Sequence, residues 1–216
     1  MEPTPNATGP EQKQLRMSFV RSLALADLFT FGNLACGAGS ILLMMKSLAT
    51  GEQRWLWFAF IALPLAVVMD ALDGRVARWR RKYSALGADL DSLADAISFG
   101  MAPAALGFTL GLQGGLDVLA LLLFVACGVG RLARFNVTAS SLSDESGKVS
   151  HFQGLPIPTS VGLVMLLLVF FLMGKTGAAI PGGVWGSDPL AFHPFSLLYV
   201  LHGLGMISGT LRIPKV

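Results

Sequence analysis

Residues 70–95 of this 216-residue chain read DALDGRVARWRRKYSALGADLDSLAD. The stretch places Asp70 and Asp73 near the end of one apolar segment and Asp91 and Asp95 inside the next, with a short basic linker between them. A charged side chain at the centre of a bilayer costs at least about 2.5–3.5 kcal/mol. Four such aspartates therefore need partners that offset this cost, and the fold and the function must both account for them.

The composition excludes a soluble protein. Hydrophobic residues make up 53% of the chain and charged residues only 13%, whereas soluble domains carry roughly 25% charged residues. Disorder is excluded as well, because it requires low hydrophobicity. The net charge of +3 is typical of membrane proteins, whose Lys and Arg collect on the cytoplasmic side. We therefore expect a lipid bilayer as the environment and no nucleic acid as a partner.

The apolar segments predict an all-α membrane protein with six transmembrane helices, since about 20 apolar residues cross a bilayer. The predicted spans are Ser22–Leu48, Trp55–Val76, Ala88–Leu110, Leu116–Phe135, Pro158–Gly174 and Phe192–Thr210. A short N-terminal helix over Leu15–Leu25 is expected to lie along the membrane interface. Residues 1–21 thus form a polar tail and interfacial segment, and residues 22–216 form one membrane domain.

The distribution of basic residues predicts the orientation. Under this topology, three of the 16 Lys and Arg residues lie on the side of the membrane opposite the cytoplasm, namely Lys46, Arg54 and Lys175. The other thirteen fall on the side of the termini: Lys13, Arg16, Arg21, Arg75, Arg78, Arg80, Arg81, Lys82, Arg131, Arg134, Lys148, Arg212 and Lys215. Both termini and the acidic stretch are therefore expected to be cytoplasmic, in the cell inner membrane.

The spacing of the four aspartates indicates a metal site. Asp70 and Asp73 are three residues apart, Asp91 and Asp95 are four apart, and each pair shares one helix face. Two helices joined by a short linker can turn these faces toward each other. Hard cations such as Mg²⁺ and Mn²⁺ prefer oxygen ligands of this kind.

Two other interpretations remain open at this point. The aspartates could instead form ion pairs with Arg75, Arg78 and Arg80 at the membrane edge. Intramembrane acids also mark the ion pathways of cation carriers and secondary transporters. Against transport stand the absence of inverted repeats in the sequence and the grouping of all four acids at one membrane face.

The stretch resembles the signature D-x2-D-G-x2-A-R-x8-G-x3-D-x3-D of the CDP-alcohol phosphotransferase family. The resemblance implies a six-helix enzyme, commonly a homodimer, with two metal ions near the cytoplasmic surface. It also implies that an alcohol attacks the phosphate of a CDP-linked lipid and that CMP leaves. By motif position, Asp70, Asp73, Asp91 and Asp95 would hold the metals, and Asp95 would be the general base. The residues implied to contact the CDP-lipid are Thr30, Asn33, Gly74, Arg78 and Ser84.

Two further segments resemble the phosphatidylserine synthase branch of this family. Residues 95–103, DAISFGMAP, match its D-x2-S-F-G-x2-P run, and residues 152–158, FQGLPIP, match F-x-G-L-P-x-P. The branch implies CDP-diacylglycerol and L-serine as substrates. Arg131 or Arg134 could bind the serine carboxylate in a two-bonded fork, and Ser98 could help to seat the amino acid. Glycerol 3-phosphate, an inositol phosphate, choline or an archaeal-type lipid remain alternative substrates.

Overall fold

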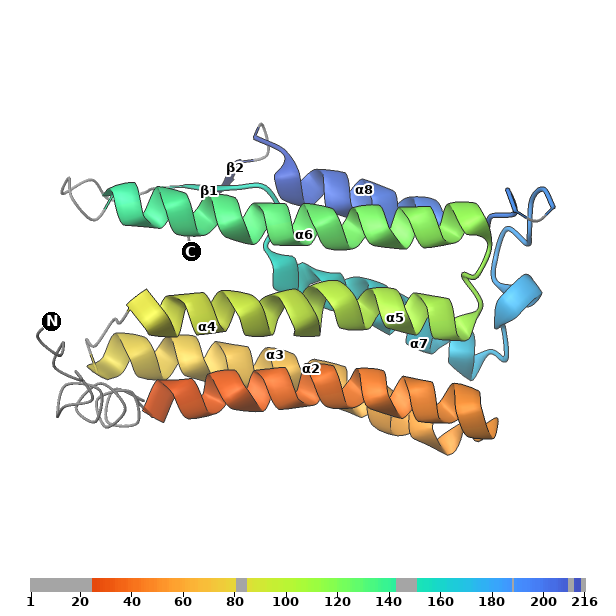
Figure 1. Cartoon of the computed structure of the whole chain (residues 1–216), viewed down its shortest axis with the longest axis horizontal. Helices are drawn as coiled ribbons and strands as arrows, with labels where there is room; N and C mark the ends of the chain where they lie inside the picture. The colour runs from red at the N-terminus through yellow and green to blue at the C-terminus, as the bar shows by residue number, and fades with distance from the viewer. Residues whose placement is uncertain (1–24, 81–84, 143–150, 188, 210–211, 215–216) are drawn as a thin grey trace, which may run out of the picture.

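The computed structural model describes residues 25–80, 85–142, 151–187, 189–209 and 212–214. Figure 1 shows one bundle of roughly parallel and antiparallel helices. Its α-helices are α2 (Leu25–Thr50), α3 (Arg54–Arg80), α4 (Ala85–Asp95), α5 (Ala102–Leu110), α6 (Gly115–Leu142), α7 (Val161–Leu172) and α8 (Ser196–Ile207). A π-helical turn, η1 (Ala96–Met101), joins α4 and α5 into one rod.

Short elements complete the described part of the chain. Strands β1 (His151–Gln153) and β2 (Arg212–Pro214) pair antiparallel and tie the segment before α7 to the segment after α8. Two 3₁₀ turns, η2 (Ile157–Ser160) and η3 (Gly177–Ala179), flank α7. Apart from this ribbon and one isolated β-bridge, the regular structure of the described residues is helical, as predicted.

Four of the six predicted spans are confirmed by length and composition. The helical stretches Asp27–Thr50, Arg54–Val76, Leu86–Leu110 and Gly115–Thr138 are long and apolar enough to cross a membrane. The third of them carries Asp91 and Asp95 and still qualifies, because α4, η1 and α5 are continuous. The chain is therefore an integral membrane protein. The predicted interfacial helix over Leu15–Leu25 lies, except for its last residue, outside the described residues.

The last two helices are shorter than predicted. Each of α7 and α8 has 12 residues, about 18 Å at 1.5 Å per residue, and falls short of a 30 Å hydrocarbon core. The predicted span from Phe192 starts four residues too early, because Phe192 pairs with Trp185 in a β-bridge. The next residue, His193, is held by Asp117 at the start of α6: its backbone N–H donates to Oδ1 at 2.7 Å, and its Nδ1 lies 2.7 Å from Oδ2.

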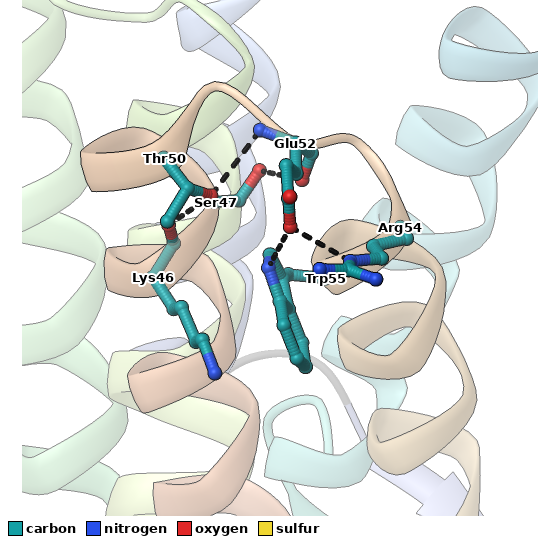
Figure 2. Close-up of polar contacts among 6 residues, drawn as sticks. All are labelled: Lys46, Ser47, Thr50, Glu52, Arg54 and Trp55. Carbon is teal, nitrogen blue, oxygen red and sulfur yellow. Dashed lines mark hydrogen bonds and ion pairs between the residues drawn. The ribbon is translucent and has the colours of Figure 1, made fainter.

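Polar groups close the turn between α2 and α3 (Figure 2). The Glu52 carboxylate accepts hydrogen bonds from Arg54 Nε at 2.7 Å and Trp55 Nε1 at 2.8 Å. The hydrogen bond from Arg54 lowers the pKa of Glu52 below its ordinary value. The Lys46 ammonium lies 3.7 Å from the centre of the Trp55 ring, a cation–π contact. A tryptophan in such a polar setting is typical of a membrane–water interface, and this turn lies at the opposite end of the bundle from the start of α4.

Helix α2 approaches the rod closely at Gly37. A Cβ added there would lie 2.1 Å from Ser98 Oγ and 2.6 Å from Ser98 Cα. Small residues permit this kind of backbone approach between membrane helices. The absence of a side chain at Gly37 therefore sets the distance between α2 and the π-helical turn.

We predict that Gly37→Ala destabilises the protein, because the added methyl must push apart α2 and η1. Overpacking of this kind costs about 1–3 kcal/mol. Gly39 on the same helix is the matched control, since a Cβ there meets nothing within 4 Å. Gly39→Ala should be neutral or stabilising by up to about 1 kcal/mol. Thermal unfolding of both variants in detergent micelles checks this, and equal melting temperatures would contradict the close contact.

Candidate active site

Three of the four predicted metal ligands come together between α3 and α4. One carboxylate oxygen from each of Asp70, Asp91 and Asp95 lies within 4.8 Å of the others. Asp70 comes from α3, whereas Asp91 and Asp95 lie one turn apart on α4. Asp95 is buried, and the other two are half-buried. The two helices thus turn their acidic faces toward each other, as the spacing predicts.

The fourth predicted ligand, Asp73, faces α2. It is buried, and its Oδ2 accepts a hydrogen bond from the hydroxyl of Thr30. It still lies within electrostatic range of Asp91 and of a further carboxylate, Asp27. Asp27 was not among the predicted site residues. The signal that could have found it is the spacing of Asp27, Thr30 and Asn33, which places all three on one face of α2.

Asn33 links α2 to Asp95. Its Nδ2 donates to Asp95 Oδ1 at 3.0 Å, and its backbone carbonyl accepts a hydrogen bond from Ser98 Oγ at 3.0 Å. Asn33 and Ser98 both have 0% exposure. The predicted CDP-lipid contact Asn33 and the predicted acceptor contact Ser98 therefore lie beside the predicted base and touch each other.

The two predicted acceptor arginines have different surroundings. Arg131 on α6 is half-buried, lies within electrostatic range of Asp95 and stacks over the Phe135 ring at 5.8 Å. Arg134 is exposed, and its Nη1 donates to the carbonyl of Ile207 at 3.0 Å. Ile207 is the last residue of α8, so Arg134 caps that helix. The local sequence around Arg134 does not predict this contact.

The remaining predicted contacts lie around the α3–α4 linker. Gly74 is exposed, and a Cβ there would meet no described atom within 4 Å. Its absence of a side chain is therefore not explained by tight helix packing among the described residues. The side chain of Arg78 and the whole of Ser84 lie outside the described residues.

The electrostatics of the cluster favour a bound cation. None of the four aspartates forms an ion pair within the part of the chain that the structure describes. Arg75, one of the three arginines considered as ion-pair partners, is exposed and forms none there. Carboxylates this close and this buried repel one another unless a positive charge lies between them. Their oxygen donors suit a hard divalent metal ion, so the residues present fit one.

Comparisons with known proteins show which family the chain resembles. Residues 23–193 match the family described as CDP-alcohol phosphatidyltransferase. A CDP-diacylglycerol–serine O-phosphatidyltransferase of Saccharomyces cerevisiae is 42% identical over 217 residues, covering 98% of this chain and 79% of the relative. The enzyme of the same name from Methanocaldococcus jannaschii is 38% identical, covering 79% of this chain and 71% of the relative.

An archaetidylserine synthase of Methanothermobacter thermautotrophicus is 37% identical over 70% of this chain and 59% of the relative. No solved structure gives a significant match to the chain. The match over residues 23–193 contains the acidic stretch together with the α2 residues that contact it. The chain belongs to the CDP-alcohol phosphatidyltransferase family.

Proposed function

We propose that this enzyme transfers a phosphatidyl group from CDP-diacylglycerol to the hydroxyl of L-serine, giving phosphatidylserine and CMP. The observation that carries the proposal is the convergence of Asp70, Asp91 and Asp95 inside a chain that is 42% identical to a serine phosphatidyltransferase over almost its full length. A reaction at a phosphate depends mainly on positioning and on neutralising charge. Clustered carboxylates that hold cations supply the second of these.

Asp70, Asp91 and Asp95 would hold Mg²⁺ or Mn²⁺, with Asp73 completing a site for two ions. When bound, such ions neutralise the diphosphate and stabilise the attacking and leaving oxygens. Thr30, which donates to Asp73, orients that carboxylate from α2. Because the donor is a neutral hydroxyl, it adds no positive charge that would compete with a cation.

Asp95 is the proposed general base. The serine hydroxyl oxygen forms a bond to the phosphorus of CDP-diacylglycerol, the bond to the CMP oxygen breaks, and Asp95 takes the hydroxyl proton. Asp95 is the most buried of the three clustered aspartates, which keeps competing water away from the reacting hydroxyl. The leaving CMP carries away the electron pair of the broken bond, so charge and atoms balance.

The CDP portion is proposed to lie near the α3–α4 linker. A Cβ at Gly74 would meet no described atom within 4 Å, which supports an approach of the nucleotide to the α3 backbone there. Arg78 and Ser84 are proposed to contact the phosphates, an assignment that rests on their motif positions. Thr30 and Asn33 belong to the same site through their hydrogen bonds to Asp73 and Asp95.

Arg131 is the proposed partner of the serine carboxylate. It lies near Asp95, whereas the Arg134 guanidinium already donates to Ile207. Serine attacking at Asp95 would bring its carboxylate into reach of Arg131, whose planar fork suits that group. Ser98 is buried behind Asn33, and we propose that it serves the acceptor site through that contact.

We further propose that residues 22–216 form one membrane domain that crosses the cell inner membrane six times and works as a homodimer. Figure 1 supports the six passes, since α7 and α8 run alongside the four longer helices. The active site and both termini would then be cytoplasmic, which agrees with the excess of Lys and Arg at that end. Residues 1–21 would form the polar tail and interfacial segment.

Metal binding should depend on the clustered aspartates. We expect Asp70→Asn to weaken Mn²⁺ binding at least about tenfold. Even the loss of a group that only hydrogen-bonds to a metal ligand lowers metal affinity by about tenfold or more. Asp89 is the matched control, since it is exposed on the same helix as Asp91 and Asp95 and stands outside the cluster. Electron paramagnetic resonance titration of free Mn²⁺ measures both variants. Equal weakening by Asp89→Asn would argue against a specific site.

Release of CMP by the purified protein in mixed micelles tests the function directly. With CDP-diacylglycerol and Mn²⁺, release should require L-serine and stop on addition of EDTA. Glycerol 3-phosphate, inositol phosphate, choline and no acceptor are the comparison reactions. Release with a different acceptor would keep the catalytic site and refute serine. No release with any acceptor from folded protein would favour a transport function instead.

Substitution of Arg131 and of Arg134 should affect different properties of the enzyme. Arg131→Ala should raise the KM for serine by about tenfold or more, because loss of a charge-assisted pair costs about 1.5–3 kcal/mol. The KM for CDP-diacylglycerol should change less. Arg134→Ala should instead lower the melting temperature, with a smaller change in the KM for serine. An unchanged KM for serine in Arg131→Ala would refute the carboxylate contact.

A further inference from the structure

A π-helical turn follows the proposed base directly. Residues Ala96–Met101 interrupt the α-helical pattern between Asp95 and α5. Turns of this kind are rare and occur frequently at functional sites. Here the turn carries Ser98, three residues after Asp95, and both side chains reach the same residue, Asn33 on α2.

The contacts form a closed arrangement of three residues. Asn33 Nδ2 donates to Asp95 Oδ1, and Ser98 Oγ donates back to the Asn33 carbonyl, each at 3.0 Å. Gly37, one turn further along α2, leaves room for Ser98, since a Cβ there would meet its Oγ at 2.1 Å. The α2 backbone, the Asn33 amide and the Asp95 carboxylate are therefore fixed relative to one another.

The burial of Asn33 bears on what its amide can contact. The residue has 0% exposure, and its Oδ1 is buried with no hydrogen-bond partner among the described residues. The amide orientation follows from the network, because turning it over would set Oδ1 against a carboxylate oxygen. Among the described residues, the side chain is thus held by its donor end alone. Its amide offers no exposed atom to a base or ribose in this structure.

A neutral donor on one oxygen of Asp95 has a specific consequence. It restrains the rotation of the carboxylate, and it occupies Oδ1 without contributing a positive charge. Oδ2 is left for the other partners proposed for Asp95, the metal ion and the reacting hydroxyl. A cationic partner at the same place would make the carboxylate a weaker acceptor for a proton.

We propose that Asn33 is a positioning residue that orients the Asp95 carboxylate for the attacking hydroxyl, and that Ser98 holds Asn33 in place. This inference rests on the proposed function, in which Asp95 is the base. It assigns Asn33 to the reacting end of the site, in place of a direct contact with the cytidine.

The test compares kcat with KM in Asn33→Leu, which keeps the shape of the side chain and removes the donor. We expect kcat to fall about tenfold to a hundredfold, as for a misplaced catalytic group. The KM for CDP-diacylglycerol and the Kd for CDP, measured by calorimetry without serine, should change by no more than about twofold. The reason is that the substitution removes no contact with the donor substrate under this proposal. Ser40→Ala is the matched control, because Ser40 is equally buried on α2 and donates only to its own helix, to Gly37 O at 2.7 Å.

A second variant covers the case in which Asn33→Leu does not fold. Ser98→Ala removes the hydroxyl that holds the Asn33 carbonyl and should lower kcat by about threefold to tenfold, again through imperfect positioning. The KM for L-serine should remain unchanged. A raised KM for serine would instead make Ser98 an acceptor contact and overturn its part in the proposal.

Two results would overturn the role of Asn33. One is a tenfold rise in the KM for CDP-diacylglycerol and in the Kd for CDP with kcat unchanged, which would make Asn33 a nucleotide contact. The other is activity equal to that of the Ser40→Ala control. A failure of the proposed function would be seen in the unmodified enzyme, as no turnover or as turnover with another acceptor. If the enzyme turns over another acceptor, kcat and KM of the Asn33 variant can still be compared with that acceptor. If it turns over no acceptor, neither Asp95 nor Asn33 has a catalytic role.

Discussion

Repulsion between carboxylates buried in a membrane protein is the constraint on which the rest of this structure depends. Asp70, Asp91 and Asp95 lie together in an environment where each charge is expensive, and in the described part of the chain no ion pair relieves them. The groups that do contact the aspartates are neutral donors, Thr30 on Asp73 and Asn33 on Asp95. Neutral donors orient carboxylates without placing a positive charge beside them, so these contacts do not take the place of a bound cation.

This constraint also explains why the buried side of α2 is polar. A membrane helix usually needs no polar face, yet the buried side of α2 carries Asp27, Thr30 and Asn33, while apolar residues such as Leu28 and Leu42 are exposed. The polar side faces the acidic helices, and the apolar side is left for lipid. Close approach at Gly37 brings the donors within hydrogen-bonding distance. The helix therefore acts as the support of the acidic site.

The sequence predicted what depends on regular spacing and missed what depends on distant partners. The i, i+4 spacing correctly placed Asp91 and Asp95 on one face of α4, opposite Asp70 of α3, and the apolar segments correctly located four membrane helices. The start of α8 was misplaced because His193 is held by Asp117, 76 residues earlier. The turn of Asp73 toward Thr30, 43 residues away, was missed for the same reason. No local pattern encodes which of several equivalent polar residues will meet across a bundle.

Arg131 and Arg134 illustrate how the same local pattern can serve two purposes. Both are arginines in the second half of α6, three residues apart, and the local sequence does not distinguish them. The last carbonyls of a helix need donors from elsewhere, and Arg134 supplies one to Ile207 of α8. That leaves one arginine of the pair near Asp95. One guanidinium suits an acceptor with one carboxylate, such as serine, because its planar fork matches that group. The cap on α8 therefore supports the proposed contact of Arg131 with the serine carboxylate, since it assigns Arg134 to another partner.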